Sequence, residues 1–482
     1  MNKINIDENI KKIHFIGIGG VSMSGLAEVM LREGFLVSGS DSSTNPLILK
    51  LKNLGVTIFD NQSHENITSD IDLVVYTAAV KDDNPEIISA KDKGIKIIDR
   101  AELLGIIMKK FKYPISVAGT HGKTTTTSMI SEILLNIGVN PTISVGGILK
   151  CIGGNFHIGD DDYFVVESCE YYNSFLKLYP YVGIILNVEK DHTDYFKNLE
   201  EIENSFNAFA RNIDSNGHLV INKNIHNFEK IISNVKCNIV TFGNSDADFF
   251  VSDLNYNENG KPCFNINFED QVLENVHLSM PGEHNIQNAL ASLAAMHSLG
   301  FSLKDTAMHL KDFNAPNRRF QFKGEFNEIK VIDDYAHHPT EIQETLSAVK
   351  KQPHSKIYCV FQPHTYTRTI ALLDEFANSF NDADTIILLD IYSAREKDTG
   401  IVSSQDLANK MSALGKDVLY FNSFQDAESF LQKKCKSNDI IITMGAGDVY
   451  LIGESILKWN AYEIAIKPWG FRPWPIIQLN DF

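Results

Sequence analysis

The sequence predicts an α/β protein of three domains, each built on a mostly parallel β-sheet. The chain has 482 residues, and at roughly 150 residues per domain this length corresponds to about three domains. Short apolar runs alternate with segments of helical periodicity in three successive series, as expected for βαβ units. Two of the series open with a strand, a glycine-rich turn and a helix. We place the domain boundaries near residues 111 and 315.

The composition excludes several classes of protein. Hydrophobic residues make up 43% of the chain, which is enough for sizeable cores, and the formal net charge is −17. This acidic balance argues against a nucleic-acid or anionic-membrane partner. From the sequence we expect no apolar leader and no membrane span, and the six scattered cysteines fit reduced thiols. We therefore expect a cytoplasmic protein. Separately, we expect a monomer or weak homodimer.

The first series predicts strands at 13–18, from 36 and at 73–76, with a helix at 23–32. Its glycine turn resembles a dinucleotide-binding fingerprint in which a serine replaces the third glycine. The turn residues are Gly17, Gly19, Gly20 and Ser22, and Asp41 follows the second strand. Glycine N–H groups at a helix N-terminus would bind a diphosphate, and an acid at this place would bind a ribose. NAD, another nucleotide diphosphate and a structural tight turn all stay open on these residues.

The second series contains the strongest local signal, a phosphate-binding loop between a strand and a helix. The series predicts strands at 115–118, 163–166 and 182–188, helices at 125–135 and 285–299, and an antiparallel insert or edge at 248–278. The loop reads Gly119-Thr120-His121-Gly122-Lys123-Thr124-Thr125. Lys123 would reach the β- and γ-phosphates of a nucleotide, and the Thr124 hydroxyl would hold Mg²⁺. The GxxGKT spacing is shorter than usual, but the strand–loop–helix context supports a phosphate site.

Polar residues follow two further strands at the same edge of this predicted sheet. Glu167 comes directly after the strand at 163–166, and Asp191 and His192 follow the strand at 182–188. Because the carboxyl ends of parallel strands share one edge, these side chains should lie near the phosphate loop. Glu167 is expected to direct Mg²⁺, and His192 or Asp191 to hold a second ion. With the loop they describe a centre for phosphoryl transfer.

The third series predicts strands at 330–332, 356–361, 385–389, 418–421 and 439–443, with helices between them. Polar residues again gather near the ends of the first two of these strands. Arg319 precedes the first strand, Asp334, Tyr335 and His337 follow it, and Arg368 follows the second. Considered singly, such residues are more typical of solvated loops than of a site.

Taken in order, these segments resemble the Mur ligase family, and within it the branch that adds the first amino acid of the peptidoglycan stem. The resemblance extends from residue 13 to about residue 457. The matching stretches are HFIGIGGVSMSGLAEVM, AGTHGKTTTTSMI, ESCEYYNSFL, NVEKDHTDYF, PGEHNIQNAL, RRFQFKGE, DDYAHHPTEI, FQPHTYTRT, YSAREKDTG and GAGDVYLIGE. Ten segments in the family's order are far more specific than any one of them.

The resemblance implies the type of each domain and the reaction. It implies a Rossmann-like UDP-sugar-binding domain at 1–111, a central P-loop ATPase-type domain at 112–314 and a Rossmann-like ligase domain at 315–457. It further implies ATP and Mg²⁺ as cofactors and UDP-N-acetylmuramate and L-alanine as substrates. The γ-phosphoryl group would pass to the muramoyl carboxylate, and the amine of L-alanine would attack the resulting acyl phosphate.

The resemblance also implies roles for residues at matching positions. The UDP-sugar would be bound by Gly17, Gly19, Gly20, Ser22 and Asp41. ATP would be bound by Gly119, Thr120, His121, Gly122, Lys123, Thr124, Thr125, Asn285, Asn288, Arg319 and Asp334. Metal ions would be held by Thr124, Glu167 and His192, and the amino acid by Tyr335, His337 and Arg368. The catalytic residues would then be Lys123, Glu167, His192 and Arg319.

Three other functions stay open. A ligase of the same family could recycle a preformed murein tripeptide instead of adding alanine. The first glycine turn could serve an NAD-dependent oxidoreductase, although the intact Lys123-Thr124 pair argues against this. A non-catalytic nucleotide-binding module is the third alternative, and the joint presence of Glu167, His192 and Arg319 argues against it.

The segment 458–482 extends beyond the resemblance and contains all three tryptophans of the chain. It lacks periodicity, and its prolines argue against a long helix. We expect an appended segment without a catalytic role, and the alternative is an aromatic docking segment.

Overall fold

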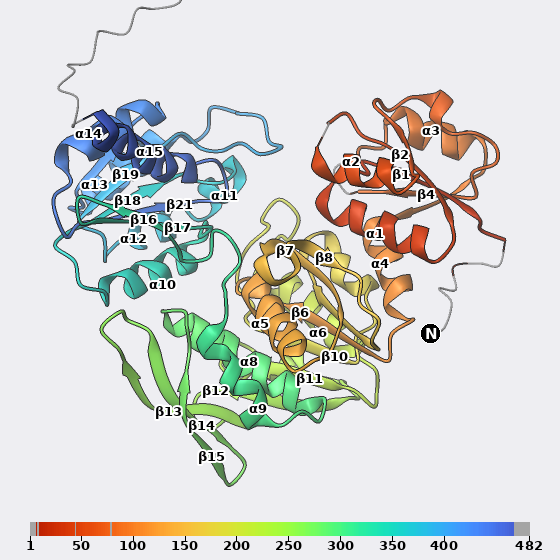
Figure 1. Cartoon of the computed structure of the whole chain (residues 1–482), viewed down its shortest axis with the longest axis horizontal. Coiled ribbons are helices and arrows are strands. Elements are labelled where there is room, and N and C mark those ends of the chain that lie inside the picture. The colour runs from red at the N-terminus through yellow and green to blue at the C-terminus, as the bar shows by residue number, and fades with distance from the viewer. Residues whose placement is uncertain (1–5, 7–8, 44, 78–79, 467–482) are drawn as a thin grey trace, which may run out of the picture. The chain divides into compact units, whose positions relative to one another are not determined.

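The computed structural model describes residues 6, 9–43, 45–77 and 80–466 (Figure 1). The chain forms two compact units. The first comprises residues up to 257 together with 261–317, and the second comprises 258–260 together with the residues from 318 onward. The first unit carries two sheets and the second carries one. The six cysteines are free thiols, and no helix of the described residues is long and apolar enough to cross a membrane.

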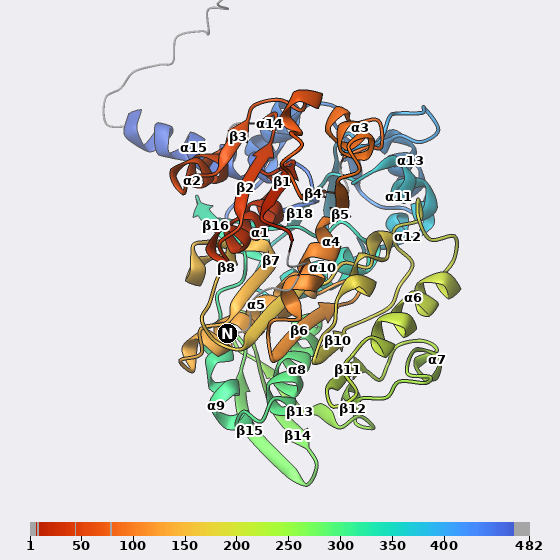
Figure 2. The same cartoon turned by 90° about the vertical axis from the view of Figure 1, so that its right-hand side faces the viewer.

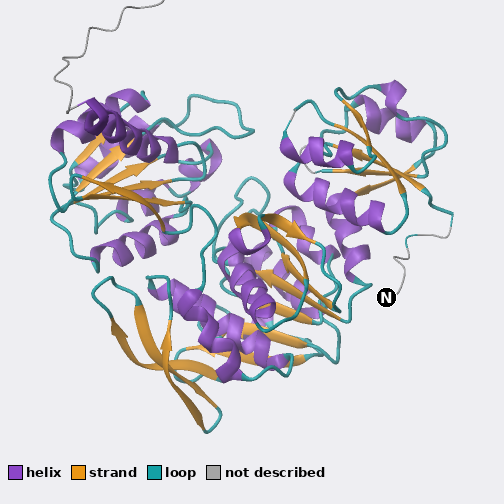
Figure 3. Ribbon diagram, viewed as in Figure 1, coloured by secondary structure: helices purple, strands orange, loops and turns teal. Residues whose placement is uncertain are grey.

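The first sheet has five parallel strands in the order β3-β2-β1-β4-β5, and helices flank it (Figure 3). Its strands are β1 (Lys12–Ile16), β2 (Leu36–Ser40), β3 (Thr57–Phe59), β4 (Leu73–Tyr76) and β5 (Lys96–Asp99). Its helices are α1 (Val21–Arg32), α2 (Pro46–Asn53), η1 (His64–Asn66), α3 (Pro85–Asp92) and α4 (Arg100–Met108). The central strand β1 is almost wholly buried, which explains its continuous apolar run.

The second sheet has ten strands in the order β15-β14-β13-β12-β11-β10-β6-β9-β7-β8. Its middle is parallel, whereas β8 and the β13–β15 extension (Figure 1) pair antiparallel at its two ends. The strands are β6 (Tyr113–Ala118), β7 (Thr142–Leu149), β8 (Gly154–His157), β9 (Tyr163–Glu167), β10 (Val182–Ile185), β11 (His218–Asn222), β12 (Asn238–Gly243), β13 (Phe249–Tyr256), β14 (Pro262–Phe268) and β15 (Gln271–His277).

Helices cover both faces of this second sheet. They are α5 (Lys123–Asn136), η2 (Lys150–Ile152), η3 (Tyr171–Lys177), α6 (Leu199–Arg211), α7 (Phe228–Ile231), α8 (Glu283–Ser298), α9 (Leu303–Ala307) and η4 (Met308–Asp312). Helices α5 and α8 lie side by side on one face, and α6 covers the other (Figure 2). Phe206 and Phe209 of α6 are fully buried in a cluster with Phe164 of β9. Burial on both faces fixes the carboxyl ends of the central strands, where the site is built.

The sheet of the second unit has six strands in the order β16-β17-β21-β18-β19-β20, parallel except for β16. Its strands are β16 (Gln321–Phe326), β17 (Ile329–Asp334), β18 (Ile357–Phe361), β19 (Thr385–Leu388), β20 (Val418–Tyr420) and β21 (Ile440–Met444). Its helices are α10 (Pro339–Lys350), α11 (Tyr366–Ala371), α12 (Leu373–Asn378), α13 (Ser404–Ala413), α14 (Phe424–Lys434) and α15 (Tyr450–Ile466).

The predicted α/β class with mostly parallel sheets is confirmed, and the antiparallel segment at 248–278 lies at the edge of the second sheet. The strand predicted at 182–188 is shorter than expected, and β10 covers only Val182–Ile185. Beyond Ile185 the chain pairs with the phosphate loop instead, through the Asn187 side chain and the backbone of His121. The domain boundaries near 111 and 315 stay predictions.

The expectation that 458–482 forms no long helix is wrong for the first part of that segment. Helix α15 begins at Tyr450 and continues to Ile466. The first proline of the segment is Pro468, which comes after the last residue of α15 and therefore removes no hydrogen bond from that helix. Trp469, Trp474 and the predicted appended or docking role of the tail lie outside the described residues.

Candidate active site

The phosphate loop joins β6 to α5 at the carboxyl edge of the second sheet. Gly122 precedes the first residue of α5 with φ of +80°, a conformation that glycine adopts without steric cost. A Cβ atom at this position would lie 2.4 Å from Asn288 Oδ1 of α8, so the close approach of the two helices also requires glycine. No side chain caps α5, and its first N–H groups with the helix dipole suit an anion.

The segment after β10 holds the loop in shape. His121 N–H donates to Asn187 Oδ1 at 2.7 Å, and Asn187 Nδ2 donates to the His121 carbonyl at 3.2 Å. Glu189 N–H donates to Thr120 Oγ1 at 2.9 Å. Asn187 was not among the predicted site residues. Its position shortly after the apolar strand β10 was the available signal.

Lys123, the first residue of α5, turns back over the loop. Its Nζ donates to the carbonyls of Gly119 and Thr120 and lies 2.9 Å from Glu170 Oε2. Burial opposes the charged ammonium, but the carboxylate of Glu170 outweighs this and raises the pKa of Lys123 above its ordinary value. Burial would likewise raise the pKa of Glu170, yet Lys123 and the hydrogen bond from His192 lower it. Both groups are therefore charged at neutral pH.

The predicted Mg²⁺ ligands Thr124 and Glu167 lie together. Thr124 Oγ1 donates to Glu167 Oε1 at 3.0 Å, and Gly146 N–H donates to Glu167 Oε2 at 2.7 Å. Hard oxygen donors of this kind suit Mg²⁺. Thr125, the next residue, is buried in α5. Glu170 was missed by the sequence analysis, although it belongs to the same ESCE segment as Glu167.

Glu170 lies between Lys123 and His192 and contacts both of them through its carboxylate. His192 Nε2 is 3.5 Å from Glu170 Oε1 and 3.9 Å from Asp191 Oδ2, and its ring stacks on Tyr171 with centroids 4.5 Å apart. Burial opposes its charged form. Hydrogen bonds with Cys169 and Glu170 and the two nearby carboxylates prevail and raise the pKa of His192 to about 10.

The chain between Glu170 and Phe175 is strained. Tyr172 and Asn173 both have left-handed backbone angles, with φ of +53° and +54°. This conformation costs free energy for a bulky residue such as Tyr172, whereas asparagine adopts it more readily. The Asn173 side chain is bonded to Tyr195 and Ser205, while Tyr172 is 54% exposed. Strain of this kind next to a buried ion pair is typical of a functional site.

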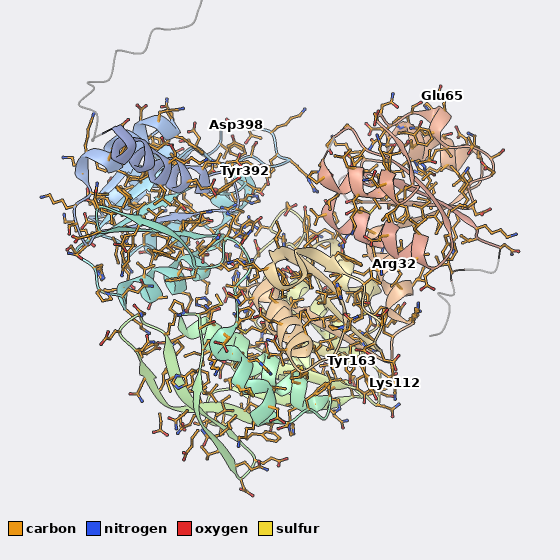
Figure 4. All side chains as sticks on the ribbon, viewed as in Figure 1. Arg32, Glu65, Lys112, Tyr163, Tyr392 and Asp398 are labelled. Carbon is orange, nitrogen blue, oxygen red and sulfur yellow. The ribbon has the colours of Figure 1, made fainter. Side chains whose placement is uncertain are left out.

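The two predicted adenine-side residues are buried at the start of α8. Asn285 Nδ2 donates to the Pro281 carbonyl at 2.7 Å, and Asn288 Nδ2 donates to Asn285 Oδ1 at 3.2 Å. Lys112 and Tyr163 mark the opposite, amino edge of the same sheet (Figure 4). The predicted site residues of this sheet lie at the carboxyl edge, where Asn288 Oδ1 faces Gly122 of the phosphate loop.

The first glycine turn joins β1 to α1 in the same unit. Gly17 has φ of +79°, Gly20 N–H donates to the Gly17 carbonyl, and Gly19 N–H donates to Asp41 Oδ2 at 2.8 Å. The acid predicted after the second strand therefore does lie beside the turn. Arg100 Nη1 donates to Ser22 Oγ at 3.1 Å, which adds a cation that the sequence analysis missed.

In the second unit the two adjacent arginines have different surroundings. Arg318 is bonded to Asp333 at 3.0 Å and to the carbonyls of Gly445 and Gly447, so it braces the loop after β21. Both guanidinium groups lie over the Tyr335 ring, 5.1 Å and 5.2 Å from its centroid. Arg319 differs in its charged partner, because its Nη1 lies 3.9 Å from Glu341 Oε1.

The carboxylate of Asp334, at the end of β17, is held by two backbone N–H groups. It accepts hydrogen bonds from Phe320 N–H and Ala336 N–H, both at 2.7 Å. Burial raises the pKa of Asp334 to about 6 despite the opposing charge of Arg319.

The residues predicted for the amino acid gather at the carboxyl ends of β17 and β18. Arg368 Nη1 lies 2.9 Å from His364 Nδ1, and the His364 ring packs edge-on against His337. His337 in turn contacts the Tyr335 ring. Tyr392, which stacks on His364, comes from the same loop as Asp398 (Figure 4). His364 and Tyr392 were not among the predicted residues.

Comparison with known proteins identifies the family. The chain is 51% identical to the UDP-N-acetylmuramate–L-alanine ligase of Acetivibrio thermocellus over 94% of this chain and 97% of that protein. The chain belongs to the Mur ligase family. A ligase of the same name from Clostridium acetobutylicum is 50% identical over 93% of this chain and 98% of its own length.

All three parts of this Mur ligase match the corresponding family domains. The Mur ligase family catalytic domain matches residues 12–112, the Mur ligase middle domain 117–296, and the Mur ligase glutamate ligase domain 318–447. The predicted membership is confirmed, and Mur ligases are ATP-dependent ligases.

Two solved structures resemble this Mur ligase closely. The UDP-N-acetylmuramate–alanine ligase of Thermotoga maritima has a TM-score of 0.76 at 29% identity and covers 94% of this chain and 99% of its own. A murein peptide ligase from Psychrobacter arcticus has a TM-score of 0.66 at 26% identity, over 93% and 98% of the two chains.

Proposed function

We propose that this Mur ligase joins L-alanine to the carboxylate of UDP-N-acetylmuramate, with conversion of ATP to ADP and phosphate, in peptidoglycan synthesis. The observation that carries the proposal is the phosphate loop, in which Lys123 is paired with Glu170 and Thr124 with Glu167. The names and near-complete coverage of relatives about 50% identical support these substrates. Because the reaction needs ATP, we place it in the cytoplasm.

A carboxylate needs activation because its negative charge repels the amine. We infer that a carboxylate oxygen of the sugar attacks the γ-phosphorus, the bond to the β–γ bridging oxygen breaks, and ADP leaves. The neutral amine of L-alanine then attacks the acyl-phosphate carbon, a tetrahedral intermediate forms, and phosphate leaves as the amine loses its proton. Each step develops negative charge on oxygen, so fixed cations and N–H donors lower its barrier.

The residues of the loop fit these steps. Lys123 stabilises charge on the transferred phosphoryl group, and the N–H groups at the start of α5 bind the other phosphate oxygens. The oxygen donors of Thr124 and Glu167, 3.0 Å apart, suit Mg²⁺, which when bound neutralises phosphate charge. His192, at the same edge, is proposed for a second metal.

The remaining roles follow the family resemblance. We assign Asn285 and Asn288 to the adenine side of the ATP site. Arg319 and Asp334 are assigned to the nucleotide, and Tyr335, His337 and Arg368 to L-alanine. The UDP-sugar is assigned to Gly17, Gly19, Gly20, Ser22 and Asp41, joined by Arg100, whose guanidinium is suited to a diphosphate.

The test is ADP release that depends jointly on UDP-N-acetylmuramate and L-alanine. We expect no sustained release when either is omitted. Equal or faster release with the murein tripeptide in place of L-alanine would favour the recycling reaction instead. Binding of NADH, measured by its fluorescence, with no substrate-dependent ADP release would favour an oxidoreductase and contradict the ligase.

A further inference from the structure

A thiol, a carboxylate and an imidazole converge beside the phosphate loop. The ligand atoms of Cys169, Glu170 and His192 all lie within 4.8 Å of one another, and His192 Nε2 is 3.5 Å from Glu170 Oε1. Cys169 also forms a hydrogen bond with His192. The Glu170 side chain is 3% exposed and that of His192 is 21% exposed. The three groups therefore form a partly enclosed cluster of metal-ligand type on the segments that follow β9 and β10.

This donor set does not match the chemistry of Mg²⁺. Mg²⁺ selects oxygen ligands, as Thr124 and Glu167 provide, whereas thiolate and imidazole select softer ions such as Zn²⁺. Zn²⁺ bonds sulfur at about 2.3 Å and nitrogen or oxygen at about 2.0–2.2 Å, so its tetrahedral ligand atoms lie roughly 3.2–3.8 Å apart. The spacing between His192 Nε2 and Glu170 Oε1 falls in this range, and Cys169 Sγ lies within 4.8 Å of the ligand atoms of both residues.

We propose that Cys169, Glu170 and His192 bind a thiophilic divalent cation of the Zn²⁺ class, away from the oxygen ligands Thr124 and Glu167. This cation would compete for His192 with the second metal ion of the proposed reaction. Three protein ligands leave a fourth position for water. On binding, the cation takes the electron pairs of Sγ and Nε2, and the protons on these atoms pass to solvent. No oxidant or reductant takes part.

Binding at this position would disturb Lys123. Glu170 Oε2 lies 2.9 Å from Lys123 Nζ, and a dication on the same carboxylate repels the ammonium. Since Lys123 is proposed to contact the phosphates, Zn²⁺ should inhibit ligation. This inhibitory consequence rests on the proposed function, whereas the metal site itself rests on the side chains alone.

The site is tested with Co²⁺ alone on the full-length protein, without nucleotide or substrate. A thiolate–Co²⁺ bond gives a near-ultraviolet charge-transfer absorption that oxygen and nitrogen ligands do not give. We expect this band at one Co²⁺ per chain, its loss in Cys169→Ser, and its displacement by one equivalent of Zn²⁺. Cys263→Ser is the matched control, because Cys263 Sγ lies 3.8 Å from His277 Nε2 and offers another thiol–imidazole pair. It should keep the band.

A second measurement uses the unaltered chain and so does not depend on a variant that folds. Zn²⁺ should slow alkylation of Cys169 by iodoacetamide at least tenfold, as followed by mass spectrometry, and leave the exposed Cys151 unaffected. Absence of the Co²⁺ band, its persistence in Cys169→Ser, or alkylation of Cys169 at the same rate with Zn²⁺ would each overturn the proposal. None of these readouts requires turnover, so failure of the proposed ligase reaction would be seen separately.

Discussion

The charge of Glu170 should control the protonation of His192, and the substitution Glu170→Gln tests this. The two side chains lie 3.5 Å apart and both are largely shielded from water. At an effective dielectric constant of about 20, two unit charges at that distance interact by about 5 kcal/mol, or about 3.5 pH units. Each charge is spread over two atoms, which reduces the effect by roughly half. Cys169 and Asp191 still favour the imidazolium in the variant.

We therefore expect Glu170→Gln to lower the pKa of His192 from about 10 to about 8. The measurement is an NMR titration of the protein with isotope-labelled histidine in buffer without Mg²⁺, with His192→Gln to assign the resonance. Glu203→Gln is the matched control, because Glu203 lies 3.5 Å from the exposed His226 and should not affect His192. A change in the pKa of His192 below about 0.5 pH unit would refute the electrostatic argument.

Three further predictions concern other parts of the site. Lys123→Met should slow ADP formation by about 100-fold or more, because a fixed cation on the transferred phosphoryl group is lost. Retention of a tenth of the activity would contradict that role. Arg318→Lys should lower the Tm of the protein by about 5–10 °C, since a lysine cannot make all the hydrogen bonds of this partly buried guanidinium to Asp333, Gly445 and Gly447, whereas Arg319→Lys should change it by less than about 2 °C. Equal changes in Tm for the two variants would contradict the separate structural role given to Arg318. Burial raises the pKa of Asp334 to about 6, so the native state holds this proton more tightly than the unfolded chain does. Its contribution to stability therefore declines by up to about 3 kcal/mol as pH rises from about 4 to 6. Asp334→Asn should flatten this part of the stability profile in denaturation experiments, and an unchanged slope would oppose the assignment.

Much of the fold was predictable because buried parallel strands read as short apolar runs. The run ending at Ala118 followed by a glycine-rich turn specified both β6 and the start of α5. The same pattern placed Glu167 and His192 at one edge of the sheet. These predictions depend only on period and on the shared direction of parallel strands.

The partners of the charged residues were not predictable in this way. Glu167 ends a strand, whereas Glu170 lies three residues further on, just before the left-handed pair at Tyr172 and Asn173. Which carboxylate faces Lys123 depends on those backbone angles, and no periodicity encodes them. The paired arginines pose the same difficulty, because Arg318 and Arg319 are neighbours in sequence and only the bonds made by β17 and the Gly445–Gly447 loop distinguish them.

The left-handed angle at Tyr172 matters for anyone who engineers this enzyme for heat resistance. Glycine adopts φ of +53° freely, so Tyr172→Gly would recover roughly 1–2 kcal/mol of backbone energy. Tyr172 packs on the rings of Tyr171 and Tyr195, and Tyr171 in turn stacks on His192. Tyr172→Gly would remove these ring contacts, so the stabilised protein would hold the His192 side chain less firmly. Its longer lifetime would therefore be offset by slower turnover.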